Sequence, residues 1–313
     1  MVDKNLISVI MTVYNSGNYL HNPLSSILAQ SYSNYELIVI NDASTDGSKE
    51  CIEVFASQNP EISLSYFENH KNLGQAASLN IGLDNARGEY VCLIDSDDRI
   101  SPNFLSLLME KIRDSLDFVY CGFDTIDTVT SKVTPYLSNR KYLDDSNEII
   151  RQYMNARNHF AFVGAIYRRE FLDKNKIRFN EVNRHGCDIE FICDLFLKRP
   201  RCGCVHESLY YYLVRPNSLS TDPQCPNIFH CVEALERIQG KMPTRLGKLR
   251  FALTRKANMI FHVVCELYEK RTKKKISIRM KYYYIWYFLF EIFRNPKQKL
   301  KSKNLRALNF FAK

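Results

Sequence analysis

Short apolar runs alternate with helical stretches over the first 125 residues, and this alternation limits the possible folds more than any other feature of the chain. It is typical of a parallel sheet covered by helices. The apolar runs predict strands at residues 6–13, 35–41, 64–68, 90–94 and 118–123. Helices are expected at residues 19–30, 46–58 and 74–86, and another after Ser101 and Pro102, which suit the N-cap and the first helical position. We predict an α/β fold with a Rossmann-like, mostly parallel sheet flanked by helices.

The alternation weakens after residue 124. Residues 144–158, 164–171 and 187–198 predict a helix, a strand and a helix, and residues 210–214 form a β-rich run before a polar loop at residues 215–221. From residue 226 onward the pattern is mostly helical. We therefore expect a helical C-terminal extension after the α/β part.

The composition is that of a globular protein. Of the 313 residues, 45% are hydrophobic and 25% are charged, which argues against a disordered or fibrous chain. The net charge is +9, and Lys and Arg crowd the region after Arg237, so an anionic surface is the expected partner of the C-terminal end. The first ten residues lack the features of a secretory signal, and a cytoplasmic location is expected.

Ten cysteines are scattered along the chain, so we expect reduced and mostly buried thiols rather than a disulfide framework. Cys202, Cys204 and His206 alternate, which on a strand would place their side chains on one face. They are either core residues of a strand or half of a metal site, although no second ligand pair has suitable spacing.

An acidic cluster directly follows the predicted strand at residues 90–94. Asp95, Asp97 and Asp98 would repel one another unless a cation lies among them or water reaches them. Mg²⁺ or Mn²⁺, bound by one or two of these carboxylates and by phosphate oxygens, would neutralise the site. The alternative is a solvated acidic turn that caps the next helix.

Polar residues also end two other predicted strands. Asp42 follows residues 35–41 and is either a ligand contact or a turn former. The first strand ends in Thr12, Val13, Tyr14 and Asn15, which either hold a base or form a plain exit from the strand. Ligands of such sheets bind beyond the carboxyl ends of the strands, so all of these residues are candidates for one site.

On this ordered set of motifs the sequence resembles the family 2 glycosyltransferases, which have the GT-A fold. The resemblance is strong over residues 6–124 and weaker to about residue 221. It implies that residues 12–15 hold the uracil and ribose of a nucleotide sugar and that Asp42 contacts the base. Residues 69–82 look like the family's asparagine- and glycine-rich run, which often has Arg where Leu79 stands. The donor-binding candidates in this run are Asn72, Gly74 and Asn80.

The family's D-x-D motif matches Asp95, Ser96 and Asp97. The resemblance implies that Asp97 binds a metal ion directly. Asp95 would assist through water or contact the ribose, and Ser96 would lie at the donor. The expected cofactor is therefore Mn²⁺ or Mg²⁺.

Asp188, at the start of the predicted helix at residues 187–198, matches the family's general base, although its usual Glu neighbour is Cys187 here. Glu190 is the second choice and would point to another side of the helix. Alternatively, Asp188 only offsets the helix macrodipole. Arg215 stands where many members have His, and it either clamps phosphate oxygens or is a solvated loop residue.

The resemblance implies a metal-dependent, inverting glycosyltransferase. Such an enzyme would move a hexosyl or N-acetylhexosaminyl group from a nucleotide diphosphate sugar, expected to be UDP-linked, to a hydroxyl of a glycan or lipid-linked glycan in bacterial surface polysaccharide synthesis. Residues 1–222 would form the catalytic domain, with a nucleotide-sugar-binding half at 1–124 and an acceptor half at 125–222. Residues 223–313 would form a helical, basic and aromatic region.

Two alternatives stay open. A catalytically inactive relative would bind a nucleotide sugar without turnover, but the acidic cluster and a candidate base argue against it. A nucleotidyltransferase should carry a Gly-rich, basic phosphate loop after the first strand, where this chain has residues 14–17, Tyr-Asn-Ser-Gly.

An aromatic run at residues 282–293 is flanked on both sides by Lys and Arg. These 12 residues are too few to span a bilayer, which takes about 20. The run either lies in the headgroup region of an anionic membrane, which we favour, or packs on the catalytic domain. Membrane contact would make the protein peripheral on the inner face of the cell membrane. No nucleic-acid motif accompanies the basic residues, so no nucleic-acid partner is expected.

Overall fold

The computed structural model describes residues 3–112, 115–135, 148–149, 161–184, 186–215 and 230–242. The strands are β1 (Asp3–Val13), β2 (Tyr35–Asn41), β3 (Leu64–Glu68), β4 (Gly88–Asp95), β5 (Arg99–Ile100), β6 (Phe118–Asp127), β7 (Val133–Pro135), β8 (Ala165–Arg168) and β9 (Cys202–Val214). The helices are α1 (His21–Leu28), α2 (Ser48–Gln58), α3 (Gln75–Asn85), α4 (Phe104–Ile112), α6 (Arg169–Lys174), α7 (Cys187–Leu197) and α8 (His230–Lys241).

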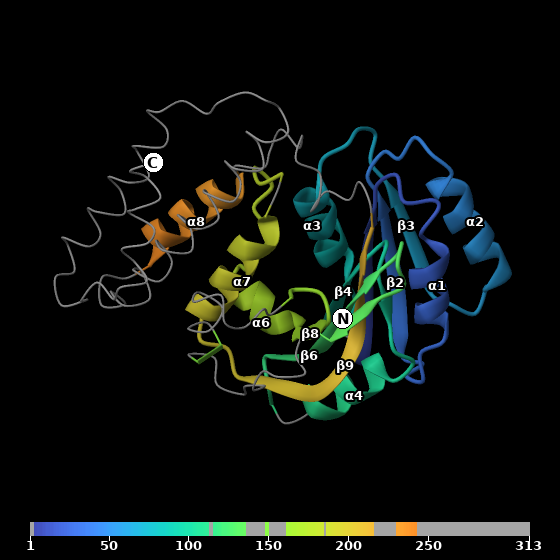
Figure 1. Ribbon diagram of the computed structural model, residues 1–313. Coiled ribbons are helices and arrows are strands. Elements are labelled where there is room, and N and C mark those ends of the chain that lie inside the picture. Colours follow the sequence, from blue (N-terminus) through green and yellow to red (C-terminus); the bar gives the residue numbers. More distant parts are fainter. Residues whose placement is uncertain are drawn as a thin grey trace.

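These strands form one sheet in the order β3-β2-β1-β4-β8-β6-β9-β5, with β7 paired to β6. The pairs among β1, β2, β3 and β4 are parallel. In Figure 1, α1 and α2 lie on one side of these strands and α3 lies on the other. The chain moves outwards from β1 to β3 and then returns to β4 on the other side of β1, so the winding reverses between β1 and β4. The carboxyl ends of these two strands therefore form a topological switch point.

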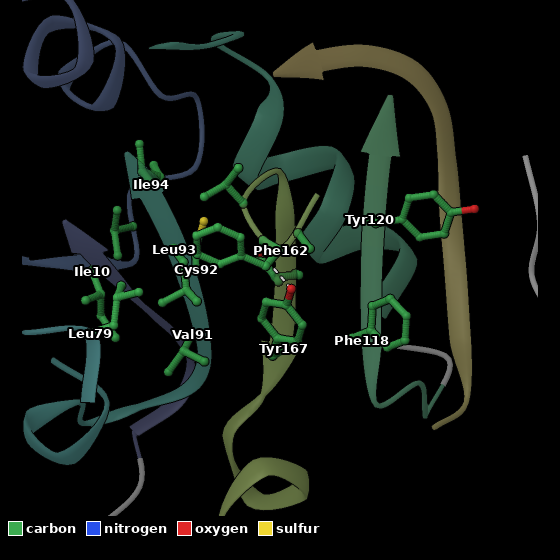
Figure 2. Packing of buried hydrophobic residues seen from close by; sticks show 14 of the residues in the cluster. Ile10, Leu79, Val91, Cys92, Leu93, Ile94, Phe118, Tyr120, Phe162 and Tyr167 are labelled. Carbon is green, nitrogen blue, oxygen red and sulfur yellow. Dashed lines mark hydrogen bonds between the residues drawn. The ribbon is translucent and has the colours of Figure 1, made fainter. Parts of the chain in front are cut away.

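Strands β1, β2 and β4 are buried on both faces over most of their length, which explains their continuous apolar sequences, whereas β3 at the edge of the sheet is only partly buried. In β1, the side chains of Val9, Ile10 and Met11 are each 0% exposed. Helix α3 packs closely on this strand because residue 82 is a glycine, and a Cβ there would collide with the side chain of Ile10. Figure 2 shows Leu79 of α3 beside Ile10 in the same core.

The second half of the sheet is mixed. Strand β8 pairs antiparallel with β4 and with β6, whereas β6 and β9 are parallel. The predicted parallel pairing is therefore confirmed for β1 to β4 and recurs between β6 and β9, whereas β8 runs antiparallel to both of its neighbours. In this half, Tyr167 of β8 donates its hydroxyl to the carbonyl of Phe162 at 2.7 Å inside the core (Figure 2).

Most predicted elements are present, with shifted ends. Strands 35–41 and 64–68 have the predicted bounds, and helix α7 ends one residue early. Helix α4 begins at Phe104, two residues beyond the predicted start at Pro102. The run at 164–171 is a four-residue strand, β8, followed at once by helix α6, and the run at 210–214 is the end of the longer strand β9.

Several predicted segments lie outside the described residues. They are most of the helix at 144–158, the loop at 216–221, and the C-terminal region from residue 243, which includes the aromatic run at 282–293. Within the described part of the chain, no helix combines the length and apolar character needed to cross a membrane. Helix α8 packs against α7, as Figure 1 shows.

The alternating residues of β9 do not share a face. Cys202 and Cys204 are buried in the core, whereas His206 is exposed. The register of β6 against β9 shifts between Cys121, which pairs with Val205, and Gly122, which pairs with Ser208, so His206 lies in an irregular stretch of β9. The three side chains therefore do not form the half-site that strict alternation would give.

Candidate active site

The candidate residues of three segments meet at the switch point. Thr12 of β1 pairs with Asp95 of β4, and Val13 pairs with Asn41 of β2. A polar loop follows each of these strands. Ser16 and Ser96, from the loops after β1 and β4, have their hydroxyl oxygens 2.8 Å apart. Residues separated by more than 80 positions in the sequence thus line one edge of the sheet.

The loop after β1 is also tied to the loop after β2. The backbone N–H of Asn15 donates to Ser44 Oγ at 3.0 Å, and Asn15 Oδ1 accepts from the N–H of Thr45 at 2.8 Å. Asn15 has a φ of 51°, in the left-handed region that Asn enters more readily than most residues. Its side chain therefore fixes the shape of the loop.

The four residues expected to hold the base differ in what they expose. Tyr14 is 47% exposed and offers an aromatic face at the edge of the sheet, and Thr12 is half-buried. Val13 is 0% exposed, so its side chain belongs to the core and does not face the crevice, in contrast to the expected donor contact.

Asp42 is buried, and the loop before α3 uses both of its carboxylate oxygens. Oδ1 accepts from Asn69 Nδ2 and from the backbone N–H of Leu73, both at 2.8 Å. Oδ2 accepts from the N–H of Gly74 at 2.7 Å. Charge-assisted hydrogen bonds of this kind are strong. In this arrangement Asp42 holds the loop at residues 69–74 in place.

Residues 72–80 contact the acceptor half. Asn72 Oδ1 accepts from Arg184 Nη1 at 3.2 Å. Gly74 has a φ of 89°, which favours a glycine, and a Cβ there would lie 2.5 Å from the same nitrogen and displace the Arg184 side chain. Asn80 is buried and exchanges hydrogen bonds of 2.9 Å with the backbone of Phe179. Asn80 therefore joins α3 to the segment before α7, and its amide does not face the crevice, which differs from the expected donor contact.

Asp95 is the last residue of β4, at the switch point of the sheet. Its Oδ1 accepts from Gln75 Nε2 at 3.0 Å. Burial, as the largest cause, and the negative charges of Asp97 and Asp188 together raise the pKa of Asp95 to about 7, although the Gln75 hydrogen bond opposes the rise. Carboxylates from β4 and α7 therefore share one electrostatic environment.

The third aspartate of the cluster is structural. Asp98 is 0% exposed, and its Oδ2 accepts from the hydroxyl of Tyr210 at 2.7 Å. Its Oδ1 accepts from the backbone N–H of Leu213 at 2.8 Å. Burial and the neighbouring charges of Asp95 and Asp97 raise the pKa of Asp98 well above its usual range. Asp98 thereby fixes the end of β9, which leads to Arg215.

Arg215 contacts the acidic cluster directly. Its Nε donates to Asp97 Oδ2 at 2.6 Å, and the side chains of both residues are about one fifth exposed (19% and 20%). The guanidinium carbon lies 4.5 Å from the centre of the Tyr19 ring, a cation–π distance. These two contacts fix the Arg215 side chain beside the acidic cluster, so it is not a solvated loop arginine.

Gln75, which the sequence analysis did not single out, bridges the two halves of the site. Its Nε2 donates to Asp95, and its Oε1 accepts from Cys187 Sγ at 3.8 Å. Burial raises the pKa of the Cys187 thiol, and the charges of Asp188 and Asp95 add to this effect. The sequence contained a signal for Gln75, because this residue follows Gly74 at the start of the helix predicted at residues 74–86. In the structure this helix start lies near the strand ends.

Asp188 and Glu190 lie in the first turn of α7 but in different surroundings. Asp188 is partly exposed and close enough to Asp95 for its charge to raise the pKa of that group. Glu190 is 2% exposed and pairs with Arg237 and Lys241 of α8. Its carboxylate is therefore occupied by the contact between α7 and α8.

The donor set at the crevice fits a divalent metal ion that arrives with a diphosphate. Within the described residues, no group of three or more His, Cys, Asp or Glu side chains could hold an ion alone. Mg²⁺ is usually bound by one or two carboxylates together with substrate phosphates, and Asp95 and Asp97 offer two. The repulsion that raises the pKa of Asp95 is what a cation would relieve.

The sequence matches the family model described as glycosyl transferase family 2 over residues 8–175, which is more than half of the chain. The chain belongs to the family 2 glycosyltransferases. The matched segment contains Asp95 and Asp97 and ends before α7.

Two bacterial relatives illustrate the relationship to this family. The glycosyltransferase YibD of Escherichia coli is 30% identical over 228 residues, which cover 70% of this chain and 64% of YibD. The minor teichoic acid biosynthesis protein GgaA of Bacillus subtilis is 32% identical over 218 residues, which cover 67% of this chain and 47% of GgaA. This family 2 chain thus aligns with less than two thirds of either relative.

Solved structures support the fold assignment. The crystal structure of residues 1–349 of Staphylococcus aureus TarS with UDP-GlcNAc superposes with a TM-score of 0.63 at 21% identity, covering 82% of this chain and 72% of that one. The mannosyltransferase PcManGT of Pyrobaculum calidifontis, solved with GDP-Man and Mn²⁺, gives a TM-score of 0.60 at 17% identity and covers 91% of this chain and 83% of that one. The predicted α/β fold with flanking helices is thereby confirmed.

Proposed function

We propose that this family 2 glycosyltransferase is metal-dependent and inverting. It moves a hexosyl or N-acetylhexosaminyl group from a UDP-sugar to a hydroxyl of a glycan or lipid-linked glycan in bacterial surface polysaccharide synthesis. The single observation that carries the proposal is the convergence of the charges of Asp95, Asp97 and Asp188 in one crevice at the switch point. Carboxylates can hold a metal ion against a diphosphate, and a carboxylate can take the proton of a nucleophilic hydroxyl.

The donor occupies the crevice between the loops after β1 and β4. Tyr14 and Thr12 offer surface for the base and ribose, and the Ser16–Ser96 contact closes the floor between the two loops. Support comes from TarS, which was solved with UDP-GlcNAc, and from PcManGT, which was solved with GDP-Man.

Asp97, assisted by Asp95, would hold Mn²⁺ or Mg²⁺, which when bound supplies Lewis-acid stabilisation of the charge that develops on the diphosphate. Support for this choice of ion comes from PcManGT, which was solved with Mn²⁺. Arg215 adds a second positive charge at the same place and can exchange its hydrogen bond to Asp97 for one to a phosphate oxygen.

Asp188 acts as the general base. The acceptor hydroxyl gives its proton to a carboxylate oxygen of Asp188 while its oxygen bonds to the anomeric carbon and the bond to the diphosphate breaks. Attack opposite the leaving group inverts the anomeric centre. Gln75, through Asp95 and Cys187, links the metal-binding side to the helix that carries the base.

The C-terminal aromatic run at residues 282–293 brings the enzyme to an anionic membrane surface, where lipid-linked acceptors are found. This part of the proposal rests on the basic flanks of the run alone. Co-sedimentation with vesicles of phosphatidylglycerol, but not with vesicles of phosphatidylcholine, would support it.

An assay of donor cleavage tests the catalytic proposal. The protein is incubated with UDP-GlcNAc, UDP-glucose, UDP-galactose or GDP-mannose, with Mn²⁺ or with EDTA, and the release of nucleoside diphosphate is measured. We expect release from at least one UDP-sugar, dependent on Mn²⁺ and lost in Asp97→Ala.

The products separate the alternatives. An inactive binding module would bind a nucleotide sugar and release nothing, and a nucleotidyltransferase would produce pyrophosphate. Release that is unchanged by EDTA or by Asp97→Ala would overturn the proposed role of the metal ion.

A further inference from the structure

Helices α7 and α8 lie side by side (Figure 1), and a cluster of charges around one buried carboxylate joins them. Glu190 of α7 is 2% exposed. Arg237 of α8 donates to Glu190 Oε2 from Nε at 3.2 Å and from Nη2 at 3.1 Å, and Lys241 Nζ donates to Oε1 at 3.3 Å. Lys241 also pairs with Asp194 at 2.7 Å. Two acidic side chains of α7 are thus matched by two basic ones of α8.

The same carboxylate is held from the segment that precedes α7. Asn180 Nδ2 lies 3.2 and 3.1 Å from the two oxygens of Glu190, and Asn183 Nδ2 lies 3.3 Å from Oε2. A buried charge needs this number of donors to be tolerated. Glu190 therefore fixes α7 relative to both α8 and the segment at residues 179–184.

A second contact joins the start of α8 to the donor side. His230 Nδ1 accepts from the backbone N–H of Arg184 at 3.0 Å. Arg184 in turn donates from Nη1 to Asn72, in the loop that Asp42 holds. Arg184 lies two residues before Gly186, the N-cap of α7. Helix α8 thus contacts α7 along its length and also contacts the chain just before α7 begins.

We infer that α8 positions α7 for catalysis and that Glu190, Arg237 and Lys241 are positioning residues for Asp188. The inference rests on the proposed role of Asp188. Asp188 and Glu190 are two positions apart on one helix, so their side chains leave it on different sides. The first turn of α7 contacts the donor side through Cys187 and Gln75, which binds Asp95, whereas Glu190 pairs with α8. Because the helix is rigid, the contact with α8 sets the position of the base.

Catalysis is sensitive to such positions. A misplacement of about 1 Å caused by a distant change can lower a rate by about 10²-fold. The match to the family model ends at residue 175, so both α7 and α8 lie beyond it.

The test compares Glu190→Gln and Arg237→Gln with the wild-type protein. UDP release from UDP-GlcNAc, or from whichever of the four nucleotide sugars is cleaved fastest, is measured with Mn²⁺ to give kcat and KM, and UDP affinity is measured by calorimetry. We expect kcat to fall about 10- to 100-fold. KM for the donor and the Kd of UDP should stay within about threefold, because the donor-side residues are untouched. Arg237→Lys, which keeps the charge, should restore most of kcat.

Arg178→Gln is the matched control, since it removes exposed ion pairs to Asp84 of α3 and Asp173 of α6. This variant should keep the wild-type kcat. If Glu190→Gln does not fold, the two Arg237 variants carry the test, because that side chain is 31% exposed and better tolerates change.

The outcomes are distinct. An active wild-type protein whose kcat is unchanged in both Gln variants overturns the positioning role alone. Equal losses in kcat and in UDP affinity, together with a lower melting temperature, also overturn it, because they indicate general loosening. A wild-type protein that cleaves none of the nucleotide sugars overturns the proposed function and this inference with it.

Discussion

Arg215 and Asp97 form a 2.6 Å ion pair between the end of β9 and the acidic cluster after β4. The pair joins a residue expected at the phosphates to the residue expected at the metal ion. The Tyr19 ring lies against the guanidinium and keeps it from turning freely toward solvent. A diphosphate that enters the crevice therefore meets a cation that is already in place and does not have to be recruited from solution.

Replacement of Arg215 should weaken binding of the leaving group. A hydrogen bond to a charged group contributes about 1.5–3 kcal/mol, so Arg215→Ala should raise the Kd of UDP with Mn²⁺ by about 10- to 100-fold. Arg215→Lys should be intermediate, because a lysine keeps the charge but not the forked geometry. Isothermal titration calorimetry gives the Kd, and an Arg215→Ala protein with wild-type affinity would show that this residue does not contact phosphate.

Replacement of Asp188 should affect the chemical step and not donor binding. General-base catalysis contributes about 10²- to 10⁴-fold, so Asp188→Asn should lower kcat by that factor with KM for the donor nearly unchanged. The matched control is Asp173→Asn, an equivalent change at a half-exposed position on α6. If the two Asn variants release UDP at equal rates in steady-state assays, Asp188 is not the base.

The parts of this fold that were predictable depend on local patterns. Strands β2 and β3 have the expected bounds because each is a β-rich run between turn-forming residues. The order and direction of β8, β6 and β9 were not predictable in this way, since they depend on pairing between residues far apart in the sequence. The sequence pattern of a buried strand is the same in both orientations.

The candidate site likewise has a part that the sequence pattern predicts and a part that depends on long-range contacts. The strand-end positions of Thr12 and Asp95 placed them in one crevice through the sheet topology alone. The hydrogen bonds that occupy Asp42, Asn80 and Glu190 could not be predicted, because their partners are backbone groups or side chains far away in the sequence. A residue type suited to ligand binding is equally suited to holding a loop.

Tyr210→Phe should destabilise the end of β9. The change removes the hydroxyl that donates to the buried Asp98, and an unsatisfied buried polar group costs about 1–3 kcal/mol. Tyr32→Phe removes a hydroxyl that donates to the carbonyl of Asn5 at the exposed edge, and this control should change the free energy of unfolding by less than about 0.5 kcal/mol. Urea unfolding followed by far-ultraviolet circular dichroism gives the free energy of unfolding of both variants. Equal stability of the two variants would show that the Tyr210–Asp98 contact does not stabilise this region.

Glu36 should make stability depend on pH at the end of the sheet opposite the candidate site. Its side chain is 1% exposed. Oε1 accepts from Ser8 Oγ at 2.6 Å and from the backbone N–H of Arg87 at 2.9 Å, and Arg87 also forms an ion pair with Oε2 at 2.7 Å. Burial alone would raise the pKa of Glu36, but these hydrogen bonds and the charge of Arg87 outweigh it and lower the pKa below 4.5.

A carboxylate with a lowered pKa in the folded state stabilises the protein at pH values above its unfolded pKa, and this contribution is lost as the pH falls through the folded pKa. Glu36→Gln should therefore lower the free energy of unfolding at pH 7 by about 1–3 kcal/mol, because Arg87 loses its charged partner. At pH 3 the difference from the wild-type protein should shrink, because below the unfolded pKa the unfolded chain already binds a proton at Glu36, which favours unfolding of the wild-type protein. Lys49→Gln, which breaks the exposed ion pair with Glu68, is the control and should have little effect at pH 7. A difference between Glu36→Gln and wild type that is the same at pH 7 and pH 3 would contradict the lowered pKa.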